Sequence, residues 1–173
     1  PLCGELPGQY GIGHFFLPAD AALRKECEAI IEQSLAVHGL HAKAWRDTPV
    51  RTALLQGHAR ESMPCIRQLL VCAYNQTEPL PAEAFERQLY VARRHMEQAI
   101  RAIGASPDAF SVASFSSHSV IYKAMVAGGQ LAAFYPDLAA TDCAVHYAIF
   151  HERYSTNTRP AWRLVQPFHC LAH

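Results

Sequence analysis

The chain lacks an excess of charge of either sign. Its 15 Lys and Arg residues balance 15 Asp and Glu residues, so the formal net charge is zero. A nucleic-acid-binding protein normally shows a basic face, so this balance argues against that class. No run of about eighteen apolar residues is present, so we expect no membrane span. No signal peptide is recognisable either. The chain begins with Pro1 rather than Met, so we expect the start of the gene product to lie upstream.

Cys-x-x-Cys pairs are also lacking, although the chain has six cysteines. Most of them lie among apolar residues. We interpret them as reduced, buried, small hydrophobic side chains and expect no disulfide framework. The six are Cys3, Cys27, Cys65, Cys72, Cys143 and Cys170.

Two groups of residues rich in histidine are candidate metal sites. His38 and His41 are separated by a glycine that breaks any shared helical face, and His169, Cys170 and His173 cluster near the end. Zinc sites usually need a fourth ligand at a defined spacing, and neither group has one. No His-Glu-x-x-His motif occurs. We therefore predict no metal site.

Two further motifs fall short of a catalytic or cofactor signature. Gly11-x-Gly13 lacks the third glycine of a dinucleotide-binding loop. Ser116, Ser117 and His118 could suggest a nucleophile and its base. However, a hairpin turn explains the serines, and adjacent side chains on a strand point to opposite faces.

The hydrophobic pattern predicts one α+β domain. A length of 173 residues suits a single domain, and strands and helices occur in mixed order rather than in alternation. Residues 66–74 could form a strand or a short helix, and residues 51–64 are expected to be irregular. The remaining expected elements are strands at 10–18, 41–50, 110–115, 120–125 and 143–152, a helix capped by Asp20, a helix at 82–103 and a short helix at 128–134.

The most informative stretch follows the expected strand at 143–152. Arg153 comes at the end of that apolar run, and Ser155, Thr156 and Asn157 follow almost at once. An arginine can hold a carboxylate through two parallel hydrogen bonds, and hydroxyl and amide groups can bind a small polar ligand. On residue types alone, two interpretations of this stretch remain. It could form a pocket for an amino acid or another carboxylate, or a surface loop with an ordinary salt bridge.

A family resemblance adds to this reading. Residues 151–162, 166–169 and 171–173 closely resemble the glutamate synthase version of the class II glutamine amidotransferase signature. Other stretches resemble the same family in the same order, so the resemblance covers nearly the whole chain. These stretches are residues 10–13, 16–18, 45–50, 59–64, 85–90, 122–123, 130–131 and 134–138.

The resemblance implies a fold and an activity. The fold is the αββα four-layer sandwich of N-terminal nucleophile hydrolases, incomplete here, with residues 1–173 as a partial type 2 amidotransferase domain. The activity is hydrolysis of glutamine to glutamate and ammonia, which reaches 2-oxoglutarate in a second domain that carries FMN and an iron–sulfur cluster. No cofactor is expected in this segment. The implied partners are glutamine and the remaining domains of a cytoplasmic or plastid enzyme.

The resemblance also implies roles for individual residues. Arg153 matches the arginine that binds the substrate carboxylate. Tyr154, Ser155, Thr156 and Asn157 match the loop that folds over glutamine. The last residue, His173, matches the position just before the family's oxyanion-hole Asn-Gly pair. Lys123 lies in a matching motif to which no catalytic role attaches.

Three positions depart from the family pattern. The family's nucleophile is a cysteine far upstream of the strand that matches residues 10–13, whereas Cys3 leads directly into it. We therefore do not expect Cys3 to be the nucleophile unless processing makes it N-terminal, and we expect the isolated chain to be inactive. His118 and Ala124 stand where arginine and glycine are expected. The alternative to an enzyme segment is a non-catalytic amidotransferase-like binding module.

Overall fold

Four strands form one antiparallel sheet in the order β2-β3-β1-β4. The computed structural model describes residues 9–73, 80–152 and 157–165. The antiparallel sheet and the flanking helices confirm the α+β class. The strands are β1 (Tyr10–Leu17), β2 (Leu40–Asp47), β3 (Cys65–Ala73) and β4 (Ser111–Ser116). The undecided run at 66–74 is thus a strand over its described part, residues 66–73.

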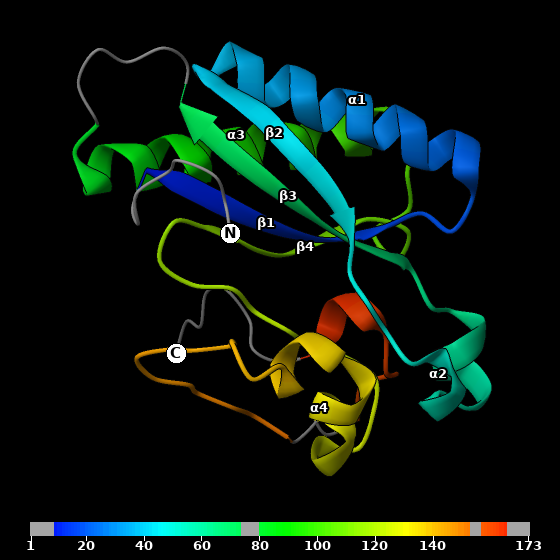
Figure 1. Ribbon diagram of the computed structural model, residues 1–173. Coiled ribbons are helices and arrows are strands. Elements are labelled where there is room, and N and C mark those ends of the chain that lie inside the picture. Colours follow the sequence, from blue (N-terminus) through cyan, green and yellow to red (C-terminus); the bar gives the residue numbers. More distant parts are fainter. Residues whose placement is uncertain (1–8, 74–79, 153–156, 166–173) are drawn as a thin grey trace.

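Two long helices cover one face of this sheet (Figure 1). Helix α1 (Ala21–Val37) begins at the expected cap, where Asp20 Oδ1 accepts a hydrogen bond of 2.8 Å from the Leu23 backbone N–H. Helix α3 (Ala82–Ala102) ends before Gly104, whose φ of 81° suits glycine. Both predicted helices are confirmed to within a residue or two.

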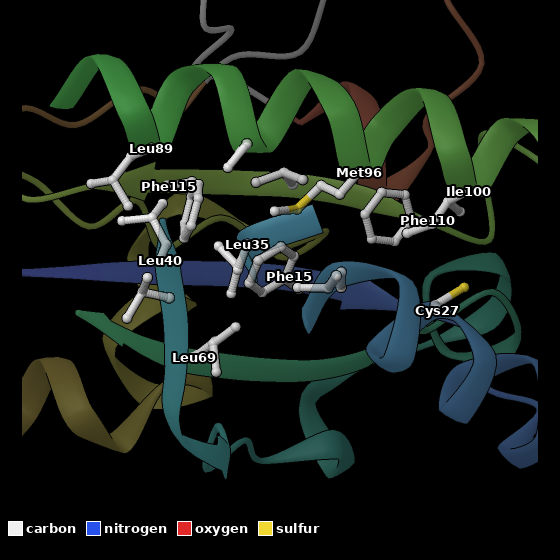
Figure 2. Close-up of a cluster of buried hydrophobic side chains, with 14 of the residues drawn as sticks. Phe15, Cys27, Leu35, Leu40, Leu69, Leu89, Met96, Ile100, Phe110 and Phe115 are labelled. Atoms are coloured by element: carbon white, nitrogen blue, oxygen red, sulfur yellow. The ribbon is translucent and has the colours of Figure 1, made fainter. Parts of the chain in front are cut away.

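The main hydrophobic core lies between these helices and the sheet. Figure 2 shows Leu89, Met96 and Ile100 of α3 pointing toward aromatic side chains of the sheet region, including Phe15 and Phe115. A Cβ atom at Gly13 would overlap the Phe15 ring, so glycine is required there. Side chains alternate along a strand, so β1 places Phe15 and Leu17 on this face and His14 and Phe16 on the other.

The opposite face of the sheet is covered by short segments rather than by long helices. Figure 1 shows α4 and the segments coloured yellow to red gathered on that side. Phe16, Ile66 and Ala113 of the sheet pack there against Phe134, Tyr135 and Trp162. The short elements are α2 (Gly57–Glu61), α4 (Leu131–Phe134) and 3-10 turns at Thr52–Leu54, Gly128–Gln130, Pro136–Ala139 and Trp162–Leu164. The described residues include one sheet, so the four-layer arrangement stays a prediction.

The predicted hairpin strand at 120–125 is wrong. Residues 117–127 are irregular, and β4 has no strand partner on that side among the described residues. Side chains bind the backbone of Ile121 instead: its N–H donates to Ser114 Oγ at 3.0 Å, and its carbonyl accepts from His14 Nδ1 at 2.8 Å. Because the N–H and the carbonyl of Ile121 are already hydrogen-bonded to side chains, they are not available for pairing with a neighbouring strand.

The predicted buried strand at 143–152 is also wrong. This segment has no regular structure in the chain, and every residue in it is exposed, including Cys143, which we expected to be buried. Val145, Tyr147, Ile149 and Phe150 are between 69% and 90% exposed. A strand needs a neighbour for its backbone hydrogen bonds, and none of the four described strands pairs with it.

None of the described helices combines the length and the apolar composition that a membrane-spanning segment requires.

Candidate functional site

Most of the predicted substrate-binding residues lie outside the described residues. These are Arg153, Tyr154, Ser155 and Thr156, together with Cys3 and His173. Asn157 is described: it is exposed and has a φ of 63°, a left-handed conformation that asparagine tolerates better than most residues. The predicted roles of these residues therefore stay predictions. What the structure provides is the framework on each side of residues 153–158, which we call the signature segment.

On the N-terminal side, Glu152, the residue before the signature segment, lies beside a tight turn. The side chain of Glu152 lies so close to Gly128 that a Cβ atom there would overlap it. Gly128 begins the 3-10 turn Gly128–Gln130, which leads directly into α4. The contact is made by the carboxyl end of the flexible, exposed Glu152 side chain, so it places this side chain beside the turn.

On the C-terminal side, Trp162 fixes the chain in the core. Its side chain is 3% exposed and meets the Phe16 ring edge-on at 5.5 Å between centroids. Its indole Nε1–H donates to the Ala59 carbonyl at 3.1 Å, so the buried polar atom is satisfied. Trp162 thus packs the chain that follows the signature segment onto β1.

Lys123 holds the backbone that follows Trp162. Its ammonium donates to the carbonyls of Arg163 at 3.3 Å and Val165 at 3.2 Å, and the residue is 4% exposed. Burial, followed by repulsion from Arg93, lowers the pKa of Lys123 to about 8. Tyr135 in turn donates its hydroxyl to the Lys123 carbonyl at 2.9 Å. Lys123 therefore positions residues 163–165, which lead into the stretch matched to the oxyanion hole.

A polar network connects several of the family motifs beneath this region. Arg46 Nε donates to Gln68 Oε1 at 2.9 Å, and Gln68 Nε2 donates to the Tyr122 hydroxyl at 2.9 Å. Tyr122 donates to Asp137 at 3.0 Å, and Asp137 also pairs with Arg46. The ring of contacts ties β2 and β3 to the turn Pro136–Ala139. These motif residues therefore have a structural role as a frame.

The serine–histidine candidate is not assembled as a nucleophile and base. The Ser117 hydroxyl donates to Glu86 at 2.8 Å, and the Ser116 hydroxyl accepts from the His118 backbone N–H at 3.0 Å. His118 itself is exposed. Both hydroxyls thus form local hydrogen bonds at the end of β4. Ala124, the other departure from the family pattern, is 5% exposed. It belongs to the hydrophobic cluster on the sheet face opposite the long helices, where its methyl group is accommodated.

Metal ligands do not gather among the described residues, in which no group of three His, Cys, Asp or Glu could hold an ion. His38 lies against His95, with ring centroids 5.3 Å apart. His169, Cys170 and His173 fall outside the described residues. Among the described cysteines, Cys27 and Cys72 are buried as expected, Cys65 is partly buried and Cys143 is exposed.

Comparison with known proteins decides the family. The family model of class-II glutamine amidotransferases matches residues 4–173. The chain belongs to the class-II glutamine amidotransferase family. It is 37% identical over 163 residues to the glutamate synthase [NADPH] large chain of Azospirillum brasilense, an alignment that covers 94% of this chain and 10% of that protein.

Other amidotransferase relatives are plant and cyanobacterial. The chain is 34% identical to ferredoxin-dependent glutamate synthase 2, chloroplastic, of Arabidopsis thaliana, and 33% identical to ferredoxin-dependent glutamate synthase 2 of Synechocystis sp.. Each alignment again covers 94% of this chain and 10% of the relative. The chain thus spans about 10% of the length of the curated relatives it matches.

Two framework residues were missed as site residues by sequence reasoning. Trp162 was recognised only as part of a motif, and Lys123 only as a residue without a role. A single signal was available for Lys123, because a lysine within an apolar stretch, Val120 to Val126, is unusual unless its ammonium finds acceptors. No local pattern identifies those acceptors, which lie about forty residues further along the chain.

Proposed function

We propose that this chain is part of the glutaminase domain of a glutamate synthase, which hydrolyses glutamine to glutamate and ammonia. The ammonia would then be transferred reductively to 2-oxoglutarate. The observation that carries the proposal is the family match over residues 4–173, with relatives that are themselves glutamate synthases. Because the chain spans about a tenth of those relatives, the remaining steps belong to other parts of the parent protein.

In this proposal Arg153 binds the α-carboxylate of glutamine. The guanidinium can form two parallel charged hydrogen bonds with a carboxylate, a geometry that a lysine cannot reproduce. Tyr154, Ser155, Thr156 and Asn157 close over the bound substrate. The anchoring of Trp162 in the core supports this role, since a substrate-covering segment needs a fixed end.

The nucleophile in this proposal is not Cys3. Its place directly before β1 differs from that of the family's N-terminal cysteine, whose own α-amine acts as the base. Further strands of the parent domain would complete the four-layer sandwich. His173 would lie beside the oxyanion hole. On this view the isolated chain binds the substrate carboxylate but releases no ammonia.

The cofactors of the parent would lie elsewhere. The relatives are named as NADPH- or ferredoxin-dependent enzymes, and the proposal places FMN and an iron–sulfur cluster in the other domains. The parent would reside in the cytoplasm, or in a plastid if it comes from a plant or alga.

The decisive experiment compares arginines in the parent glutaminase. Arg153→Ala should weaken glutamine use by about 2–5 kcal/mol in kcat/KM, because the buried carboxylate loses its charged partner. Arg153→Lys should recover only part of that loss. Arg159→Ala is the matched control, since Arg159 is an exposed arginine in the same region. Equal kinetics for the Arg153 and Arg159 variants would overturn the assignment of Arg153.

The alternative is a binding module without hydrolysis. It predicts glutamine binding that depends on Arg153 but no ammonia release from the parent. The same assay therefore separates the two. A chain that begins at Cys3 tests the processing variant directly, because ammonia release from glutamine there would restore Cys3 as the nucleophile.

A further inference from the structure

A cavity of about 230 Å³ lies along the second half of α3. This volume is below the roughly 300–1,000 Å³ of pockets for drug-sized ligands, so the cavity suits a small group. Its charged lining comes from three separate parts of the chain. Arg93, Glu97 and Arg101 belong to α3, Lys123 to the irregular segment after β4, and Arg163 to the turn after the signature segment.

The lining has four cations and one carboxylate, and two of the cations are already neutralised. Arg93 Nε donates to Glu97 Oε1 at 2.9 Å, and Arg163 Nε donates to Asp108 Oδ1 at 2.7 Å. The carboxylate of Glu97 cannot also neutralise the remaining two cations, because Arg94 pairs with it as well at 2.6 Å. The cavity therefore keeps an excess of positive charge.

Lys123 and Arg101 supply that excess. Among the described residues, no carboxylate pairs with either of them. Lys123 is buried, and both of its hydrogen bonds go to neutral backbone carbonyls. A buried ammonium without a counter-ion is costly, which is consistent with the lowered pKa of Lys123. An anion in the cavity would remove much of that cost.

We propose that this cavity binds a small oxyanion, a carboxylate or phosphate group, between Lys123 at its buried end and Arg101 at its exposed rim. A guanidinium binds either group through two hydrogen bonds, and the lysine adds a point charge. The proposal uses none of the residues assigned to glutamine, so it does not depend on the proposed function. The excess of positive charge disfavours cations.

Isothermal titration calorimetry of the full chain with inorganic phosphate and with succinate tests the proposal. Ionic strength is held constant with sodium chloride, so that general screening does not change between injections. At least one of the two anions should bind at a single saturable site. Binding of phosphate alone, or of succinate alone, would identify which oxyanion the cavity takes.

Two arginines on α3 provide a matched pair of variants. Arg101→Gln should weaken binding by about tenfold or more, the usual effect of losing a charged hydrogen bond. Arg87→Gln removes the same charge from an exposed position on the same helix outside the cavity. It should change the affinity by less than about twofold, because a distant exposed charge is screened.

Proton uptake tests the role of Lys123 separately. An anion beside Lys123 favours the protonated ammonium against burial and the repulsion from Arg93, so binding at pH 8.5 should take up protons. Calorimetry in two buffers of different ionisation enthalpy measures this uptake, and Lys123→Gln should abolish it. Absence of saturable binding, an equal loss in Arg87→Gln and Arg101→Gln, or binding without proton uptake would each overturn the proposal. The Arg101 comparison stands even if Lys123→Gln does not fold.

Discussion

His14 donates a hydrogen bond from Nδ1 to the carbonyl oxygen of Ile121 at 2.8 Å. A carbonyl only accepts, so this contact assigns the proton of the neutral ring to Nδ1 and leaves Nε2 as an acceptor. The His14 side chain is fully buried, and its Nε2 has no hydrogen-bond partner among the described residues. The contact ties β1 to the segment that leads into Lys123.

This relationship predicts a specific acid sensitivity. Burial of the ring, partly offset by the bond to Ile121, lowers the pKa of His14 from 6.5 to about 4. Between these values the unfolded chain binds a proton that the folded chain does not, so stability falls as the pH drops from 6.5 to 4. The loss should be about 3 kcal/mol.

His14→Asn isolates this contribution, because the asparagine amide can still donate to Ile121 but does not titrate. Urea unfolding at several pH values should show a shallower decline between pH 6.5 and 4 for His14→Asn than for the unchanged chain. His58→Asn, at an exposed histidine of α2, is the control and should leave the slope as it was. Parallel pH profiles for His14→Asn and the unchanged chain would contradict a buried neutral His14.

Trp162 is predicted to be the main anchor of the signature segment. Trp162→Ala should cost about 3–5 kcal/mol of unfolding free energy, since it removes a buried indole packed against Phe16. Trp162→Phe keeps much of the packing but leaves the Ala59 carbonyl without its donor, so it should cost about 1–3 kcal/mol.

Chemical denaturation measures both costs. Tyr90→Ala, at a tyrosine that is 58% exposed on α3, should change the unfolding free energy by less than about 0.5 kcal/mol. If Trp162→Ala were as mild as Tyr90→Ala, the anchoring role of Trp162 would be wrong.

Gly13 is predicted to be irreplaceable for steric reasons. In Gly13→Ala the new methyl group would meet the rings of Phe15 and Phe115, which lie in the densely packed core beneath α3. Overpacking of this kind typically costs about 1–3 kcal/mol. Gly129→Ala provides the control, because nothing lies within 4 Å of a Cβ atom there. Thermal unfolding of the two variants should show a clear loss for Gly13→Ala and little change for Gly129→Ala.

The sequence predicted the elements that depend on local signals. Helix α1 has a capping aspartate, and α3 has apolar residues at helical spacing with a glycine after its end. The failures at 120–125 and 143–152 share one cause, because a strand forms only when another segment offers hydrogen bonds. An apolar run shows that burial is favourable but does not identify the partner.

The frame around the candidate site was harder to predict for a related reason. Arg46 and Asp137 are 91 residues apart, and the ring of contacts through Gln68 and Tyr122 exists only after the sheet has formed. In the sequence, nothing next to any of these residues distinguishes it from an ordinary polar side chain. The resemblance located the motifs that contain them, but their contacts follow from the tertiary structure.

The exposed run at 143–152 leads to the last prediction. Ile149 and Phe150 are 90% and 88% exposed, and an extended apolar segment of this kind invites association between chains. Changing both residues to lysine should reduce the concentration-dependent association of the isolated chain, as measured by light scattering. In the parent, other segments are proposed to cover the same residues, so there the double substitution should lower the thermal unfolding temperature. Ile103→Lys, at a 40% exposed isoleucine beside α3, is the control in both proteins. A double variant that leaves the stability of the parent unchanged would mean that this run also stays outside the core there.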